Sequence, residues 1–247
     1  MEANPTIGLT RPIAPQSRSR LFTDAALSQM LVLLHDASGA GDGRSDPYAR
    51  MAPHMALGLR FLILTLTRRT EAAGARRSEI DPAARTWTIP GERTKNRQAH
   101  VVPLSPQAIE VLDAARRLPG AALDGYLFPS PTRPGAHLEP HAITRAVNRM
   151  CARLSLPLGS PHDFRRTGAT TLTSERYGFR RFVVGKVLGH TAHDGAAVTS
   201  VYDRNEYLAD KRQALDAWGR HVQGLTPQDH DASPSPQRRH LHLVTAA

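Results

Sequence analysis

The sequence predicts a mainly α-helical domain with a small antiparallel β-sheet. Three observations lead to this fold class. Apolar residues recur at helical spacing behind residues that favour helix starts, as they do after Thr23. Pro53 and Pro106 stand where further helical patterns begin, and a proline suits the first turn of a helix. Between these prolines, Thr86-Trp87-Thr88-Ile89 is rich in residues that favour strands.

The remaining elements follow from the same signals. Thr23 caps a helix whose apolar face is Leu27, Met30, Leu31 and Leu34. Further helices are expected at 53–66, 105–118 and 139–155, from Pro161 onward, at 183–188 and at 207–222. Strands are expected at 86–89, 93–97 and 100–102, with a turn at Asp81-Pro82 before them. Gly189 is expected to end one helix, and Tyr202 to lie on a short helical segment.

Composition sets the expected domain boundaries. Residues 1–20 carry prolines among polar residues and are expected to form a flexible leader. Residues 224–247 include Ser233-Pro234-Ser235-Pro236 and are expected to be a disordered tail. Residues 21–223 then form one domain, which is long enough to bury a sizeable core.

The charge of the chain favours a polyanionic partner. The formal net charge is +10 and the pI is near 10.7, and basic groups displace counterions from a phosphate backbone. Charge alone leaves nucleic acid and an anionic membrane surface both open. The only lysines are Lys95, Lys186 and Lys211, so arginine dominates. Arginine binds phosphate through two parallel hydrogen bonds, although a GC-rich genome would give the same bias.

Cysteine usage and hydropathy indicate a cytoplasmic protein. Cys151 is the only cysteine, so no disulfide can form within one chain, as is usual in a reducing cytosol. The longest apolar run, at 61–64, is too short to cross a bilayer, and the first residues lack the apolar core of a signal peptide. We therefore expect no membrane association.

Six residues spread over half of the chain can together attack a phosphodiester without a metal. Tyr202 can supply a phenol oxygen as nucleophile. Two arginines can stabilise the negative charge that develops on the non-bridging oxygens. Taken singly, the tyrosine is more simply a helix anchor and each arginine a solvated charge. The six candidates are Arg68, Lys95, His162, Arg165, His190 and Tyr202.

The other candidates have roles in proton transfer and orientation. His162 and Arg165 are three residues apart on one expected helix and so share a face. His162 can accept or relay a proton, and Lys95 can give one to the leaving oxygen, which arginine cannot do. His190 can donate a hydrogen bond to a non-bridging oxygen, and Glu71 can orient Arg68. The simpler alternatives are helix-end histidines and a surface ion pair.

A metal site is the main rival interpretation of the histidines. His190 and His193 are close in sequence, and His162 could join them. No set of histidines and carboxylates has metal-binding spacing such as His-Glu-x-x-His. We therefore expect no metal.

The six residues, in this order, resemble the catalytic domain of tyrosine recombinases, the phage-integrase family. The likeness covers about residues 20–222 and is greatest to the integrases of prophages and genomic islands, which are mobile genetic elements. Further similar segments are Gly74–Asp81, Trp87-Thr88-Ile89-Pro90 and Val102-Pro103-Leu104-Ser105. By this likeness, Arg68, Lys95, His162, Arg165, His190 and Tyr202 take the family's catalytic positions. Leu66 departs from the family pattern, which usually has glycine there, and so does Arg77, where tryptophan is frequent.

The resemblance also implies a fold, a reaction and partners. The fold is mainly helical with a small antiparallel sheet at one edge, and the reaction needs no metal or nucleotide cofactor. Double-stranded DNA would be cut and rejoined through a 3′-phosphotyrosyl intermediate, with self-association as a tetramer on DNA. The apolar stripe of Leu208, Leu215, Trp218 and Val222 would pack within its own domain or dock on a neighbouring subunit.

Two other functions remain compatible with the sequence. One is a non-catalytic DNA-binding remnant of an integrase, and the other is a DNA-relaxing enzyme similar to type IB topoisomerases. Family members carry a helical core-binding domain before the catalytic domain, and nothing before residue 20 can form one. We therefore expect a short variant, a decayed gene product or a fragment, with weak and nearly sequence-blind DNA binding.

Overall fold

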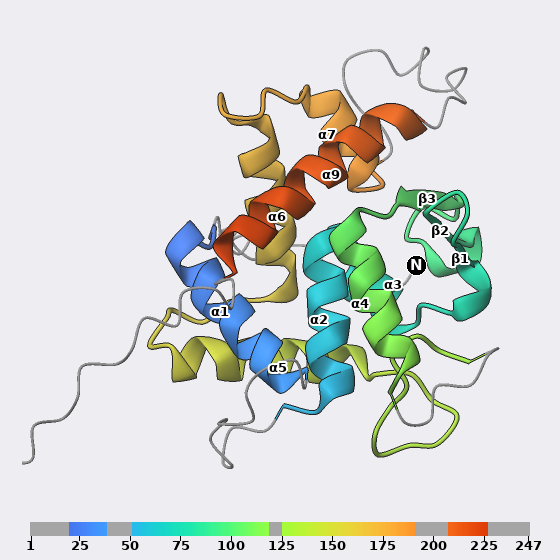
Figure 1. Cartoon of the computed structure of the whole chain (residues 1–247), viewed down its shortest axis with the longest axis vertical. Helices are drawn as coiled ribbons and strands as arrows, with labels where there is room; N and C mark the ends of the chain where they lie inside the picture. Colours follow the sequence, from blue (N-terminus) through green and yellow to red (C-terminus); the bar gives the residue numbers. More distant parts are fainter. Residues whose placement is uncertain (1–19, 39–50, 119–124, 191–206, 227–247) are drawn as a thin grey trace, which may run out of the picture.

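The computed structural model describes residues 20–38, 51–118, 125–190 and 207–226. It confirms the predicted mainly helical fold with a small antiparallel sheet (Figure 1). The helices are α1 (Asp24–Ala37), α2 (Pro53–Thr65), α3 (Arg69–Ala73), α4 (Pro106–Arg116), α5 (Pro140–Arg153), α6 (Pro161–Thr173), α7 (Arg181–Val187) and α9 (Leu208–Leu225). The strands are β1 (Ile80–Asp81), β2 (Thr86–Ile89) and β3 (His100–Pro103), and the short 3-10 helices are η2 (Arg77–Glu79) and η3 (Gly91–Arg93).

The helices begin where the capping signals placed them. The Thr23 side chain accepts a hydrogen bond from the Ala26 amide, and Ser105 does the same for Ala108. At the start of α6, Ser160 and Asp163 form a reciprocal capping box around Pro161. These local bonds satisfy amides that have no partner inside the helix, so they fix the residue at which each helix starts.

The three strands lie at one edge of the molecule in the order β1-β2-β3 (Figure 1). Both pairs are antiparallel, with Trp87 opposite Ile80 on one side and Val102 on the other. The predicted strand at 93–97 is wrong, because η3 and a turn occupy these residues. The Thr94 hydroxyl donates to the Gly91 and Gln98 carbonyls, and these local bonds favour a tight turn over an extended strand.

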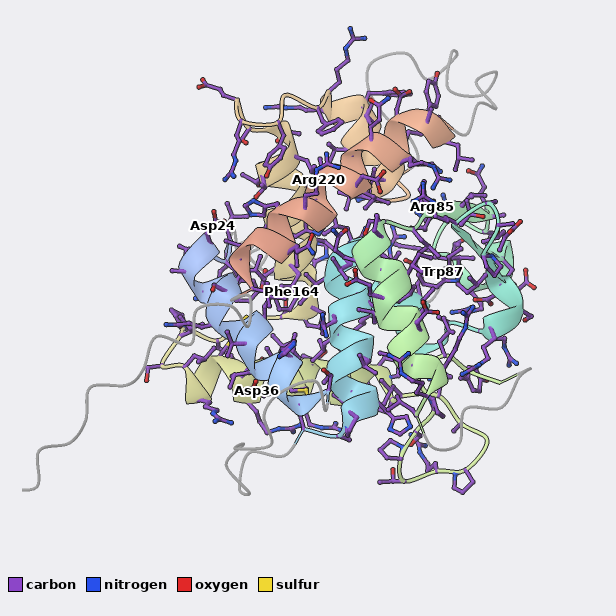
Figure 2. The ribbon with its side chains drawn as sticks, viewed as in Figure 1. Asp24, Asp36, Arg85, Trp87, Phe164 and Arg220 are labelled. Atoms are coloured by element: carbon purple, nitrogen blue, oxygen red, sulfur yellow. The ribbon has the colours of Figure 1, made fainter. Side chains whose placement is uncertain are left out.

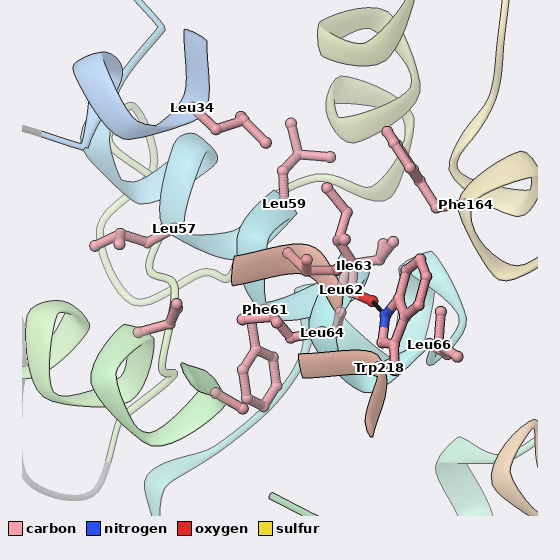
Figure 3. Close-up of a cluster of buried hydrophobic side chains, with 14 of the residues drawn as sticks. Leu34, Leu57, Leu59, Phe61, Leu62, Ile63, Leu64, Leu66, Phe164 and Trp218 are labelled. Atoms are coloured by element: carbon pink, nitrogen blue, oxygen red, sulfur yellow. Dashed lines mark hydrogen bonds between the residues drawn. The ribbon is translucent and has the colours of Figure 1, made fainter. Parts of the chain in front are cut away.

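Helix α2 is the centre of the core. It packs against α1, α4 and α9, and nearly all of its residues from Met55 onward are buried. Figure 3 shows its side chains surrounded by other elements, with the Trp218 indole beside Ile63. The indole Nε1 donates to the Ile63 carbonyl over 2.7 Å. A helix that is apolar on all sides in this way is typical of a buried core helix.

Aromatic contacts attach the sheet to the helices. The rings of Trp87 in β2 and Phe61 in α2 have centroids 5.1 Å apart. Four of the charged residues labelled in Figure 2 are exposed, namely Asp24, Asp36, Arg85 and Arg220. No helix in the described ranges is long and apolar enough to cross a membrane.

Helix α9 packs on the helices of its own chain. Leu215, Trp218 and Val222 are buried in the core, and only Leu208 of the predicted stripe is exposed. Of the two predicted alternatives, the structure therefore shows the stripe packed within its own domain. It does not support docking of the stripe on a neighbouring subunit. The helix ends at Leu225, three residues beyond the predicted end at 222, and the Leu225 carbonyl accepts a hydrogen bond from the Ser28 hydroxyl of α1. The predicted leader up to residue 19 and the tail from 227 lie outside the described residues.

Candidate active site

Arg68 stands at the junction of α2 and α3 and is held by Glu71. The Arg68 amide donates to Glu71 Oε2 over 2.7 Å, and its Nη1 donates to Glu71 Oε1 over 2.9 Å. Glu71 is almost completely buried. One carboxylate therefore fixes both the main chain and the guanidinium of Arg68, which confirms the orienting role predicted for Glu71.

Arg165 lies on α6 and is almost completely buried. Its Nη1 donates to the Leu66 carbonyl, and its Nη2 donates to the Leu188 carbonyl over 2.8 Å. Burial and the charge of Arg68 lower the pKa of Arg165 to about 10, so it stays protonated at neutral pH. Among the described residues, no carboxylate lies within ion-pair distance of Arg165. Its positive charge is therefore available to an anion.

Leu66 adopts the left-handed conformation that explains the glycine expected there. Its φ is 52°, which is unfavourable for a residue with a side chain. The fully buried Leu66 side chain packs against Gly168 of α6, where an added Cβ would come within 2.5 Å of it. Gly168 therefore makes room for Leu66. The resulting turn directs the Leu66 carbonyl to Arg165.

His162 and His190, the two predicted site histidines, both lie close to Arg68 and Arg165 although they come from different segments. His162 is exposed on the first turn of α6, and His190 follows Gly189, whose φ of 61° ends α7 as predicted. Burial and then the Arg165 charge lower the pKa of both histidines. Arg68 lowers both as well, and His162 lowers that of His190. Both rings are therefore favoured in the neutral form beside two guanidinium groups.

The C-terminal turn of α7 organises this cluster. Its carbonyls at Val187, Leu188 and Gly189 face His100 Nε2, Arg165 Nη2 and Arg68 Nη2 at 3.2, 2.8 and 3.5 Å respectively. We call Arg68, Arg165 and residues 187–190 the arginine clamp. His100 was not singled out by the sequence, because no local pattern relates it to α7.

Lys95 is placed differently from the clamp residues. It is exposed in the turn between η3 and β3. Within the described ranges, no hydrogen bond or ion pair joins it to Arg68, His162, Arg165 or His190. The structure therefore brings together four of the six predicted site residues and leaves Lys95 on the adjacent hairpin.

Tyr202 lies outside the described residues, as does His193. The next tyrosine, Tyr207, is described at the start of α9. Its ring packs edge-on against Phe182 at 4.9 Å, with Lys186 Nζ 5.1 Å from its centre. In the part of the chain that is described, no group of three or more histidine, cysteine and acidic side chains could hold a metal ion.

The sequence profile described as the phage integrase family matches residues 45–207 of the chain. This match covers the clamp, the Lys95 turn and both histidines. The chain belongs to the phage integrase family. The family also accounts for the fold, in which the arginines come from separate helical segments and the sheet lies at one edge.

Individual relatives agree with this family. The chain is 35% identical to prophage integrase IntA of Escherichia coli K12 over 156 residues. The aligned residues make up 63% of the chain and 36% of IntA. The integrase of mycobacterium phage Brujita has the same fold, with a TM-score of 0.56 and 17% identity over 91% of the chain and 69% of that protein. The XerH site-specific recombinase, solved in a pre-cleavage complex with its difH substrate, has a TM-score of 0.50, with 18% identity over 82% of the chain and 52% of that protein. The chain spans about a third of the length of IntA.

Proposed function

We propose that this chain is the catalytic domain of a site-specific DNA recombinase that cuts and rejoins double-stranded DNA through Tyr202. One observation carries the proposal. Arg68 and Arg165, which are 97 positions apart, both donate to the C-terminal turn of α7, and His162 and His190 lie within reach of their charges. Such a cluster of fixed positive charge suits the developing negative charge of a phosphoryl transition state.

In the proposed reaction, Arg68 and Arg165 bind the non-bridging oxygens of one DNA phosphate. The phenol oxygen of Tyr202 attacks phosphorus, and its proton passes to neutral His162. The bond from phosphorus to the 5′ oxygen breaks as Lys95 gives that oxygen a proton. The products are a 3′-phosphotyrosyl link and a free 5′ hydroxyl. Attack by a 5′ hydroxyl on the link reverses each transfer and rejoins the DNA.

The proposed partner is double-stranded DNA, with self-association as a tetramer on it. The net charge of +10 supports a polyanionic partner. XerH, which has the same fold, was solved with its difH substrate. A cytoplasmic location is proposed with this function, because the DNA of a prophage host lies there.

The test is covalent trapping on a nicked suicide duplex, from which the cut strand diffuses away and cannot be rejoined. Tyr202→Phe should abolish the protein–DNA adduct and leave DNA affinity nearly unchanged, because the phenol carries no charge. Arg165→Ala should weaken both, with a loss of adduct on the order of 10³-fold. Arg116→Ala is the matched control, since Arg116 is exposed on α4 and pairs with Asp113.

The outcomes separate this function from its alternatives. A wild-type adduct yield from Tyr202→Phe would refute Tyr202 as the nucleophile and make Tyr207 the candidate. DNA binding without any adduct from the wild-type chain would favour a non-catalytic remnant. Relaxation of supercoiled DNA without strand exchange between two duplexes would favour the topoisomerase-like enzyme.

A further inference from the structure

His100 connects the small sheet to the arginine clamp. It is the first residue of β3, and its half-buried ring places Nε2 3.2 Å from the Val187 carbonyl at the end of α7. The ring also lies against the backbone of Gly189, where an added Cβ would meet it at 3.4 Å. His100 therefore contacts the turn that precedes His190 both through a hydrogen bond and through direct packing.

The contact between His100 and Val187 is one of three that involve successive carbonyls at the end of α7. The last carbonyls of a helix have no partner inside the helix and need outside donors. At α7 the donors are His100 for Val187, Arg165 for Leu188 and Arg68 for Gly189. The position of this turn therefore depends on one donor from the sheet and two from the site itself.

The surroundings of His100 keep its ring neutral. Burial lowers its pKa to about 4, and Lys211 and Arg165 lower it while Glu71 raises it. Lys211, buried on α9, donates to the carbonyl of Val101, the residue after His100. A neutral imidazole whose Nε2 faces a carbonyl carries its proton on Nε2. The donor thus holds the turn without placing another charge beside the phosphate site.

We propose that His100 is a positioning residue for DNA cleavage, which holds the C-terminal turn of α7 so that Arg68, Arg165 and His190 face one phosphate. This inference rests on the proposed function. His100 itself touches neither the DNA nor the reacting atoms. It acts through the Val187 carbonyl, and it fixes the distance between the clamp and the hairpin that carries Lys95.

Two substitutions and a matched control test the role. His100→Gln keeps an N–H donor that can reach the Val187 carbonyl, whereas His100→Leu removes the donor and keeps an apolar side chain. His137→Leu is the control, because His137 is also half-buried and its Nδ1 lies 2.6 Å from a carbonyl, at Leu138, outside the clamp. Single-turnover adduct formation on the suicide duplex is measured at saturating DNA and corrected for the folded fraction.

We expect His100→Leu to slow adduct formation by about tenfold, the size of one buried hydrogen bond. His100→Gln should stay within about threefold of wild type, and DNA affinity should not change in either variant. A purely structural role would lower the melting temperature without slowing the folded fraction. An unchanged rate in His100→Leu, or an equal loss in His137→Leu, would overturn the proposal.

A second measurement does not depend on cleavage. Hydrogen exchange of the Gly189 and His190 amides, which bond to Lys186 and Gly185, should be about tenfold faster in His100→Leu and near wild type in His100→Gln. Faster exchange in a chain that forms no adduct would reject the proposed function and keep the positioning of the turn. Unchanged exchange would reject the positioning role, whatever the cleavage activity.

Discussion

Arg165 is almost completely buried and both ends of its guanidinium donate to main-chain carbonyls, whereas Lys95 lies exposed in a turn beside the sheet. The arginine clamp is thus fixed by bonds between α2, α6 and α7. The Lys95 turn is closed by local bonds from Thr94 to the carbonyls of Gly91 and Gln98, and Arg93 just before it donates to Glu79 and to the Glu71 carbonyl. In the proposed reaction, the clamp would bind the non-bridging oxygens of the phosphate and Lys95 would protonate the leaving oxygen.

This difference corresponds to the work that each region would do. Charge stabilisation is most effective when the donors are in place before the reaction, since no reorganisation is then needed. A proton donor must reach a leaving oxygen whose position is set by bound DNA, and catalytic hydrogen bonds often tighten only with substrate. We therefore expect the clamp to be in place before DNA binds, and the exposed Lys95 side chain to move toward the leaving oxygen when DNA is bound.

Of the substitutions that separate the clamp from the Lys95 turn, those of Lys95 should have the largest effect, which is on the rate of adduct formation. Lys95→Ala should slow adduct formation by on the order of 100-fold, because the leaving oxygen loses its proton donor. Lys95→Arg should not restore the rate, since arginine keeps its proton. Stability should change by less than about 0.5 kcal/mol, because the side chain is exposed.

The leaving group itself provides the control for Lys95. A duplex with sulfur in place of the 5′ bridging oxygen expels a thiolate, which needs no proton. Lys95→Ala should cleave this duplex at nearly the wild-type rate, whereas Arg165→Ala should remain slow on both duplexes. An equal defect of Lys95→Ala on the oxygen and sulfur duplexes would show that Lys95 does not act as the acid.

The local parts of this arrangement could be predicted from the sequence. Capping residues and apolar periodicity placed the helices after Thr23, Pro53 and Ser105 within a few residues. The packing of Leu66 against Gly168 and the bond from His100 to Val187 join positions about 90 to 100 residues apart. No local pattern encodes such pairs, because they depend on how the elements pack. The prediction of a strand at 93–97 failed for a local reason instead. Hydrogen bonds within this segment favour a turn over the strand that its residues suggested.

The packing behind the clamp gives the next largest effect. Gly168→Ala should destabilise the fold by about 1–3 kcal/mol, because its Cβ would lie 2.5 Å from the fully buried Leu66 side chain. Gly185→Ala on α7 is the control. Nothing lies within 4 Å of its added Cβ, so it should be neutral or stabilise by up to about 1 kcal/mol.

The pairing of the two positions is tested by a double-mutant cycle. Leu66→Gly alone should destabilise by about 2 kcal/mol, because loss of a buried leucine outweighs relief of the left-handed backbone. In that background Gly168→Ala should become neutral or stabilising, since the clash is gone and alanine favours the helix. Urea unfolding of the four proteins measures the coupling. The same loss from Gly168→Ala in both backgrounds would show that Gly168 does not accommodate Leu66.

The smallest effect expected is a pH dependence of stability that arises from His100 and not from Lys95. The pKa of His100 is about 4 in the folded chain, below its ordinary 6.5. Between these values the unfolded chain binds a proton that the folded chain does not, so stability falls as pH drops through this window. His100→Gln should remove on the order of 1–2 kcal/mol of the loss of stability between about pH 7 and pH 4.5.

The pKa shifts of His162 and His190 have the same sign, but both side chains are exposed and should add little to this loss. Lys95→Ala should leave the curve unchanged, because the Lys95 side chain is exposed and is not bonded to His100. Urea unfolding at the two pH values measures the difference, and an undiminished loss in His100→Gln would place the titrating group elsewhere.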